Sequence, residues 1–96
     1  MKTICVCDLQ SNELGEIKKQ LPRDTKILAV GVRKVYNIGR VCEIPFVVVK
    51  VDESEPEEYE FKFLENGESV EDGYDFIGTI ALTNGTNVYS IFCRKS

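Results

Sequence analysis

The 96-residue chain contains no histidine and no apolar run long enough to cross a membrane. A membrane-spanning helix needs about 20 consecutive apolar residues. Without an imidazole, the chain cannot use a histidine base, a histidine metal ligand or a histidine pH switch. Ser–His and Cys–His nucleophile pairs are excluded for the same reason. The sequence therefore excludes the hydrolase mechanisms that depend on histidine.

Phosphate-binding loops and an excess of basic residues are missing too. Neither G-x-G-x-x-G nor the P-loop lysine motif occurs. The net charge of −4 disfavours general DNA binding and membrane-surface binding, because both need clustered Lys and Arg. The charge is uneven, with nine basic and five acidic residues in 1–50 against three and eleven in 51–96. Such asymmetry is typical either of a partner surface or of a solvated acidic face.

No metal site or cofactor is expected. The cysteines lack the paired C-x₂₋₄-C spacing of common zinc sites, and a reducing cytosol disfavours disulfides, so we expect free thiols. The acidic stretch 52–60 fails as an EF-hand loop, because Glu57 and Phe63 stand at its sixth and twelfth positions. It reads better as a solvated loop, or as a surface that mimics nucleic-acid phosphate. The four cysteines are Cys5, Cys7, Cys42 and Cys93.

Short runs of alternating hydrophobicity, separated by turn residues, predict an all-β fold. We expect six or seven mostly antiparallel strands in one domain, residues 1–96, arranged as a small sandwich or partly open barrel. The expected strands cover residues 3–7, 26–36, 41–51, 59–64, 76–82 and 87–93.

Side-chain patterns predict the place of several strands. Residues 26–36 begin with apolar side chains on both faces, which indicates a central strand. Pro45 cannot donate to a β-ladder, so it marks an edge, a bulge or an interruption. In residues 59–64, Glu60 and Lys62 are expected to face solvent. The aromatic residues expected in the core are Phe61, Phe63, Phe76, Tyr89 and Phe92.

Turn chemistry predicts the connections. Asn84-Gly85 is the preferred pair for a tight hairpin turn with positive φ at both central residues. A second turn is expected at residues 37–40, where Gly39 can adopt a positive φ. Residues 52–58 and 65–75 read as acidic loops. Residues 11–22 fit either a helix capped by Ser11 or a strand.

Five segments together resemble a family of small uncharacterised β domains encoded by tailed bacteriophages and prophages. They are MKTI at 1–4, LPRDTKILAVGV at 21–32, VVVKVDESEP at 47–56, YEFKFLENGESV at 59–70 and YDFIGTIALTNGTNVYSIF at 74–92. Residues 33–45 depart from the family pattern by a longer connection. The resemblance implies a compact β domain, favours a strand at 16–21, and implies a phage accessory role in the host cell cytoplasm. It supplies no catalytic residues.

The candidate ligand-binding residues are Arg33, Lys34, Tyr36 and Arg40, which surround the 37–40 turn. Guanidinium groups suit phosphate oxygens and an aromatic face suits a base. Strand alternation places Lys34 and Tyr36 on one face and Arg33 on the other, so one subunit would hardly close a pocket. Two subunits meeting across the hairpin could do so. The alternative is a solvated hairpin tip.

These observations favour a non-enzymatic protein that inhibits a host defence. It would either sequester a (cyclic) nucleotide immune signal between subunits or occlude a defence protein. One alternative is a structural or assembly accessory of the virion, and another is a carboxylate-dependent hydrolase. Because open sheet edges favour pairing between copies, we expect a homo-oligomer. Neither a membrane nor sequence-specific nucleic acid is an expected partner.

Overall fold

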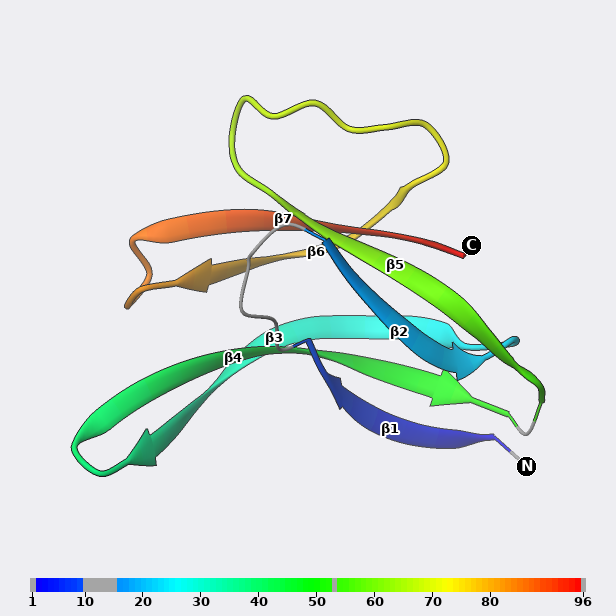
Figure 1. The fold of residues 1–96 in the computed structure, drawn as a ribbon, viewed down its shortest axis with the longest axis horizontal. Helices are drawn as coiled ribbons and strands as arrows, with labels where there is room; N and C mark the ends of the chain where they lie inside the picture. Colours follow the sequence, from blue (N-terminus) through cyan, green and yellow to red (C-terminus); the bar gives the residue numbers. More distant parts are fainter. Residues whose placement is uncertain (1, 10–15, 53, 96) are drawn as a thin grey trace.

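Seven antiparallel strands form two sheets in the computed structural model, which describes residues 2–9, 16–52 and 54–95 (Figure 1). One sheet has three strands in the order β1-β4-β3, and the other has four in the order β2-β5-β7-β6. The sheets pack as a small sandwich and do not close into a barrel, so the expected fold class is confirmed. The strands are β1 (Thr3–Asp8), β2 (Glu16–Pro22), β3 (Lys26–Asn37), β4 (Arg40–Val51), β5 (Pro56–Leu64), β6 (Asp75–Leu82) and β7 (Asn87–Lys95).

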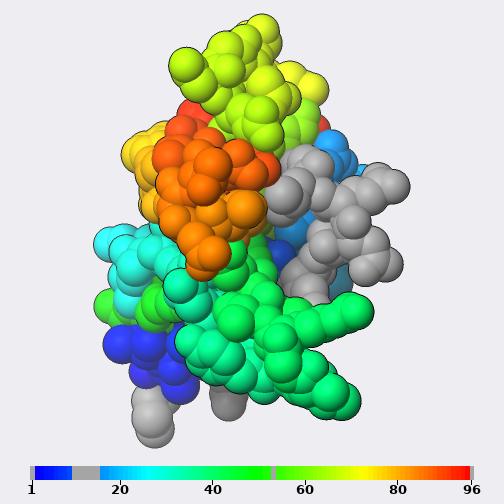
Figure 2. Space-filling model, turned by 90° about the vertical axis from the view of Figure 1, so that its left-hand side faces the viewer, coloured from blue at the N-terminus to red at the C-terminus, as the bar shows by residue number. Residues whose placement is uncertain are grey.

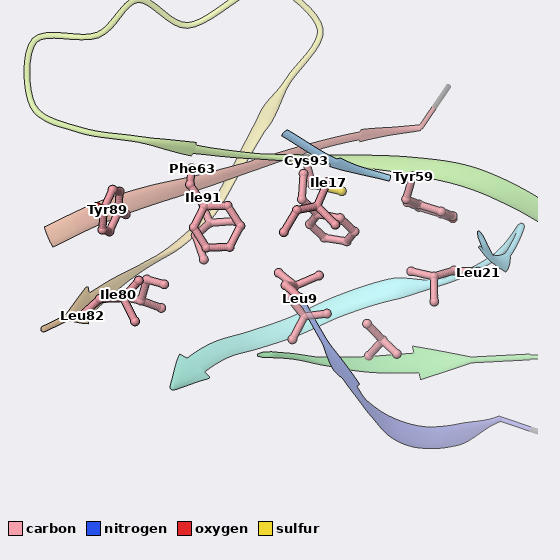
Figure 3. Close-up of a cluster of buried hydrophobic side chains, with 13 residues drawn as sticks. Leu9, Ile17, Leu21, Tyr59, Phe63, Ile80, Leu82, Tyr89, Ile91 and Cys93 are labelled. Carbon is pink, nitrogen blue, oxygen red and sulfur yellow. The ribbon is translucent and has the colours of Figure 1, made fainter. Parts of the chain in front are cut away.

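The core lies between the two sheets (Figure 3). Alternate residues of each strand point inward, because successive side chains of a strand face opposite sides of the sheet. The predicted inward positions Phe61, Phe63 and Tyr89 are confirmed as buried. The buried apolar residues are Leu9, Ile17, Leu21, Val47, Val49, Tyr59, Phe61, Phe63, Ile80, Leu82, Tyr89, Ile91 and Cys93.

The predicted central position of residues 26–36 is wrong. β4 is central in the three-stranded sheet, and β3 forms one of its edges. The inner face of β3 packs against the core, and Leu28, which stands at the bulge, is exposed. Apolar residues at the start of β3 therefore do not mean that the strand is central. β4 runs unbroken through Pro45, which pairs with the end of β1 through the Leu9 amide. Beyond Pro45, β4 has only β3 beside it among the described residues, so the proline marks a change from interior to edge.

Three predicted core or surface positions are also wrong. Phe92, which was expected in the core, is half-buried and lies opposite Phe76 on the outer face of the four-stranded sheet. Phe76 is exposed on the outer face of the four-stranded sheet, where its ring meets the half-buried Phe92 edge to face. Glu60 is buried on that same outer face, because Tyr74 and Arg94 cover its carboxylate. The acidic loop expected at 52–58 ends early, since β5 begins at Pro56.

Residues 11–22 were expected to form either a helix or a strand, and the structure describes residues 16–22 of this segment. Residues 16–22 form the strand β2, paired with β5, so a helix there is wrong. The expected cap Ser11 lies outside the described residues. β2 pairs with β5 along its whole length, and Ile17 and Leu21, which lie on the same face of the strand, enter the core.

Candidate functional site

The β3–β4 hairpin extends beyond the rest of its sheet. Both strands have 12 residues, whereas β1 pairs with β4 only as far as Asp8 and Phe46. The distal half of the hairpin is therefore two-stranded, and it forms the lower left end of Figure 1. Figure 2 views this end directly and shows it standing out below the orange β6–β7 turn.

The turn that closes the hairpin is conformationally unusual. Asn37 pairs with Arg40, and both central residues have positive φ, 45° for Ile38 and 72° for Gly39. Such turns favour Asn-Gly. A left-handed conformation costs most residues with a Cβ about 1–2 kcal/mol, whereas glycine has no Cβ and the short polar side chain of Asn can hydrogen-bond locally. A β-branched residue there is a true outlier. Gly39 is thus explained by backbone geometry and Ile38 is not.

Three apolar side chains are exposed around this turn. Tyr36 is 77% exposed, Ile38 96% and Val41 52%. Tyr36 and Val41 are directly opposed in the antiparallel register and so share one face of the hairpin. We call residues 36–41 the hairpin tip. Neighbouring exposed apolar side chains of this kind are characteristic of interaction sites.

The structure divides the four predicted ligand residues between two faces. Lys34 and Tyr36 lie on the face that continues the inner side of the sheet. Arg33 and Arg40 lie on the opposite face, because their register partners Ile44 and Asn37 alternate with those of the first pair. One copy of the chain therefore does not bring all four residues to one ligand.

Arg33 also forms an ion pair with Asp8 of β1. Its Nη2 donates to Oδ2 at 2.6 Å and its Nε donates to Oδ1 at 3.3 Å. This hydrogen bonding lowers the pKa of Asp8 and raises the pKa of Arg33. A phosphate would have to compete with the carboxylate for the guanidinium.

Sequence reasoning missed Ile38 and Val41 as site residues. The signal for Ile38 was present, since isoleucine stands where a tight turn favours Asn or Gly. The signal for Val41 required the hairpin register, which places it beside Tyr36.

The base of the hairpin is held from two sides. The Asn84 amide donates to Glu43 Oε1 at 3.2 Å, which joins the hairpin to the β6–β7 turn. On the other face, the Arg33–Asp8 pair joins it to β1. The hollow beside the turn is lined by Asn37, Ile38 and Arg40 and opens to solvent. The arrangement presents an apolar tip and does not enclose a small molecule.

A second polar cluster lies on the outer face of the four-stranded sheet. Tyr74 donates to Glu60 Oε2 at 2.9 Å, and Arg94 Nε donates to the same oxygen at 3.0 Å. Lys62 and Arg94 lie over the Tyr74 ring at 4.9 and 4.5 Å. Desolvation and the hydrogen bond to Glu60 raise the pKa of Tyr74. Each group is engaged by its neighbours, so the cluster secures the loop that precedes β6.

Metal-ligating side chains do not cluster in the part of the chain that the structure describes. Its His, Cys, Asp and Glu side chains form no group of three or more that could hold a metal ion. All four cysteines are free: Cys5 and Cys42 are exposed, Cys7 is half-buried and Cys93 is buried. Residues 2–9, 16–52 and 54–95 contain no helix able to span a membrane.

Comparisons with protein-family models, curated proteins and solved structures give no match for this chain.

Proposed function

We propose that this protein is a non-enzymatic binding protein that inserts the hairpin tip into an apolar recess of a protein partner. The observation that carries the proposal is Ile38, which combines a φ of 45° with 96% exposure. A strained backbone that makes no stabilising contact is a cost to folding. Binding to a partner accounts for the isoleucine, since a protruding apolar side chain gains burial only there.

The surroundings of Ile38 suit a protein partner better than a nucleotide. Tyr36 and Val41 enlarge the apolar surface, and aromatic anchors with neighbouring aliphatic groups dominate the binding energy of many protein interfaces. A nucleotide needs phosphate and base contacts together, whereas Arg33 and Tyr36 lie on opposite faces. The phage-family resemblance makes a bacterial defence protein the partner that we expect, met in the host cytoplasm.

The test uses a substitution that separates folding from binding. Ile38→Asn supplies the residue that the turn favours, so it should raise the free energy of unfolding by about 1 kcal/mol. It should also abolish capture of the partner from a bacterial lysate by the immobilised full-length protein. The captured partner is then purified, and its affinity for each variant is measured directly by calorimetry.

The matched control is Val88→Thr, which changes an exposed apolar residue on the other hairpin. It should retain the partner, whereas Tyr36→Ala should lose it. If Ile38→Asn binds the partner as tightly as the unmodified protein does, the hairpin tip is not the binding site. Native mass spectrometry with cyclic and linear nucleotides tests the other class of ligand. If the protein gains the mass of one nucleotide per two chains, the ligand is a nucleotide and the proposal of a protein partner is wrong.

A further inference from the structure

Four strands border the two sheets, and three of them are protected against pairing with another chain. Natural sheets protect edges with charged residues, proline or bulges. β2 carries Lys18 and Lys19 and ends in Pro22. β3 has a bulge between Ile27 and Ala29, and β6 has a similar irregularity after Phe76.

β1 has no bulge and no proline, and its one charged residue, Asp8, stands at its end. Its register with β4 runs without a shift from Thr3 to Asp8, and residues 3–7 carry no charge and no proline. Ile4 is 67% exposed and Val6 is 62% exposed. No strand of the described residues pairs with β1 on the side away from β4.

The hydrogen bond at the end of β1 shows which backbone groups of β1 point away from β4 and could bond to a further strand. The Leu9 amide donates to the Pro45 carbonyl oxygen at 2.8 Å. Because backbone groups alternate in direction along an antiparallel strand, those of Cys7 and Cys5 point to β4. Those of Ile4 and Val6 point to the open edge, where a further strand could receive them.

We propose that β1 pairs with β1 of a second copy, antiparallel and about a two-fold axis, with Cys5 opposite Cys5 of the second copy. The register follows from the side chains. It places Ile4 opposite Val6 and Lys2 opposite Asp8, so apolar groups meet apolar groups and opposite charges meet. The two neighbouring registers that keep the same backbone groups facing each other are less favourable. One places Val6 opposite Lys2, and the other places Ile4 opposite Asp8.

The dimer joins two three-stranded sheets into one sheet in the order β3-β4-β1-β1-β4-β3. The interface is isologous, since both copies contribute the same strand. It covers the edge of β1, which carries neither a bulge nor a proline. It leaves both hairpin tips available, because each tip lies at the far end of its hairpin from the strands that pair (Figure 1).

Oxidative cross-linking tests the register. In the proposed pairing, the two Cys5 residues form a non-hydrogen-bonded pair with Cα atoms about 4.5 Å apart, within the range of a disulfide. Diamide treatment of the full-length protein should give a covalent dimer on a non-reducing gel. Cys7→Ser and Cys42→Ser should still form it, and Cys5→Ser should not. A covalent dimer that persists in Cys5→Ser would overturn the register.

Sedimentation velocity under reducing conditions tests the dimer itself. The unmodified protein should sediment as a dimer at micromolar concentration, and Val6→Lys should weaken the dimer about a hundredfold because two apolar contacts are lost. The matched control Val88→Lys, on the other sheet, should remain dimeric. Circular dichroism verifies that each variant is folded.

Lys2→Glu gives a second variant that leaves the strand itself unchanged. It sets like charges opposite each other, so it should weaken the dimer, and added salt should restore part of the affinity. A monomeric unmodified protein, or a dimer that Val6→Lys and Lys2→Glu leave intact, would overturn the proposal. Neither result bears on the hairpin tip, whose test is partner binding by Ile38 variants.

Discussion

Tyr74 lies between two cations and above a buried carboxylate. Its hydroxyl donates to Glu60, which is 8% exposed, and Arg94 donates to the same oxygen. A buried carboxylate is costly unless hydrogen bonds and opposite charge compensate it. The sequence pattern correctly placed Glu60 on the outer face of its sheet, but the expected exposure to solvent is wrong because Tyr74 and Arg94 cover the carboxylate. The covering residue comes from a loop 14 positions away.

We predict that Tyr74→Phe lowers the free energy of unfolding by about 1 kcal/mol, because it removes one hydrogen bond to Glu60 and keeps the ring. Tyr74→Leu should cost more, since the ring contacts with Lys62 and Arg94 are lost as well. Urea unfolding followed by circular dichroism measures both. Equal stability of the Phe and Leu variants would show that the ring contacts contribute nothing.

The Cys93 thiol is buried among core side chains, and burial raises its pKa to about 11. Thiolates are the reactive form of cysteine, so this thiol is protected by both burial and protonation. We predict that a thiol reagent at pH 8 labels the exposed Cys42 rapidly and labels Cys93 only when urea unfolds the protein. Mass spectrometry of peptides from each sample identifies the labelled residue. Rapid labelling of Cys93 in the native protein would contradict its place in the core.

At the scale of elements, the sandwich closes where β3 passes close to β6. Gly78 follows the irregularity in β6, and a Cβ atom added there would collide with Val30 Cγ2 on β3. The two sheets approach closely at this point because glycine has no side chain. The sequence pattern showed a glycine inside a strand, which indicates a bulge or a close approach without saying to which element.

We predict that Gly78→Ala destabilises the protein by about 1–3 kcal/mol, since it overfills a packed contact between sheets. Val30→Ala removes the colliding methyl group, so the double variant should be less unstable than the sum of the single variants. Thr79→Ala, on the neighbouring exposed position of β6, serves as the control and should change little. Additive effects of Gly78→Ala and Val30→Ala would exclude this contact as the cause.

For the whole molecule, two ion pairs tie separate parts of the fold together. Arg33 of β3 holds Asp8 of β1, and Lys62 of β5 holds Glu71 of the loop before β6 at 2.7 Å. Hydrogen bonding from each cation lowers the pKa of its carboxylate partner. Both pairs are close to solvent, so each contributes modestly and is weakened by salt.

We predict that stability falls between about pH 5 and pH 3. A carboxylate whose pKa is lowered by folding stabilises the native state fully above its unfolded pKa, near 4, and loses this contribution as the pH drops through its folded pKa. Urea midpoints measured from pH 7 to pH 3 should therefore decline at the acidic end. The double variant Asp8→Asn, Glu71→Gln should show a flatter profile, and an unchanged slope would mean that other carboxylates carry the effect.

The local sequence determined six of the seven strands. Alternation of apolar and polar residues has a period of two, and turn residues such as Asn84-Gly85 act over four positions, so both signals are complete without tertiary contacts. Positive φ at Asn84 and Gly85 confirms that turn, although Thr83 shares the conformation. Six predicted strands correspond to β1 and β3–β7, and the ambiguous residues 16–22 form β2.

Only the tertiary structure decided the order of strands and what covers their outer faces. Strand order placed β4 in the centre of its sheet and left β3 and β1 at the edges. The same pairing left the β3–β4 hairpin with no third strand beyond Asp8 among the described residues, and Tyr36 and Ile38 are exposed there. Glu60 is buried because Tyr74 and Arg94 cover its carboxylate, whereas Phe76 on the same face is exposed. The alternation of residues shows which side chains share a face of a strand. Contacts between segments far apart in the sequence decide which face meets solvent.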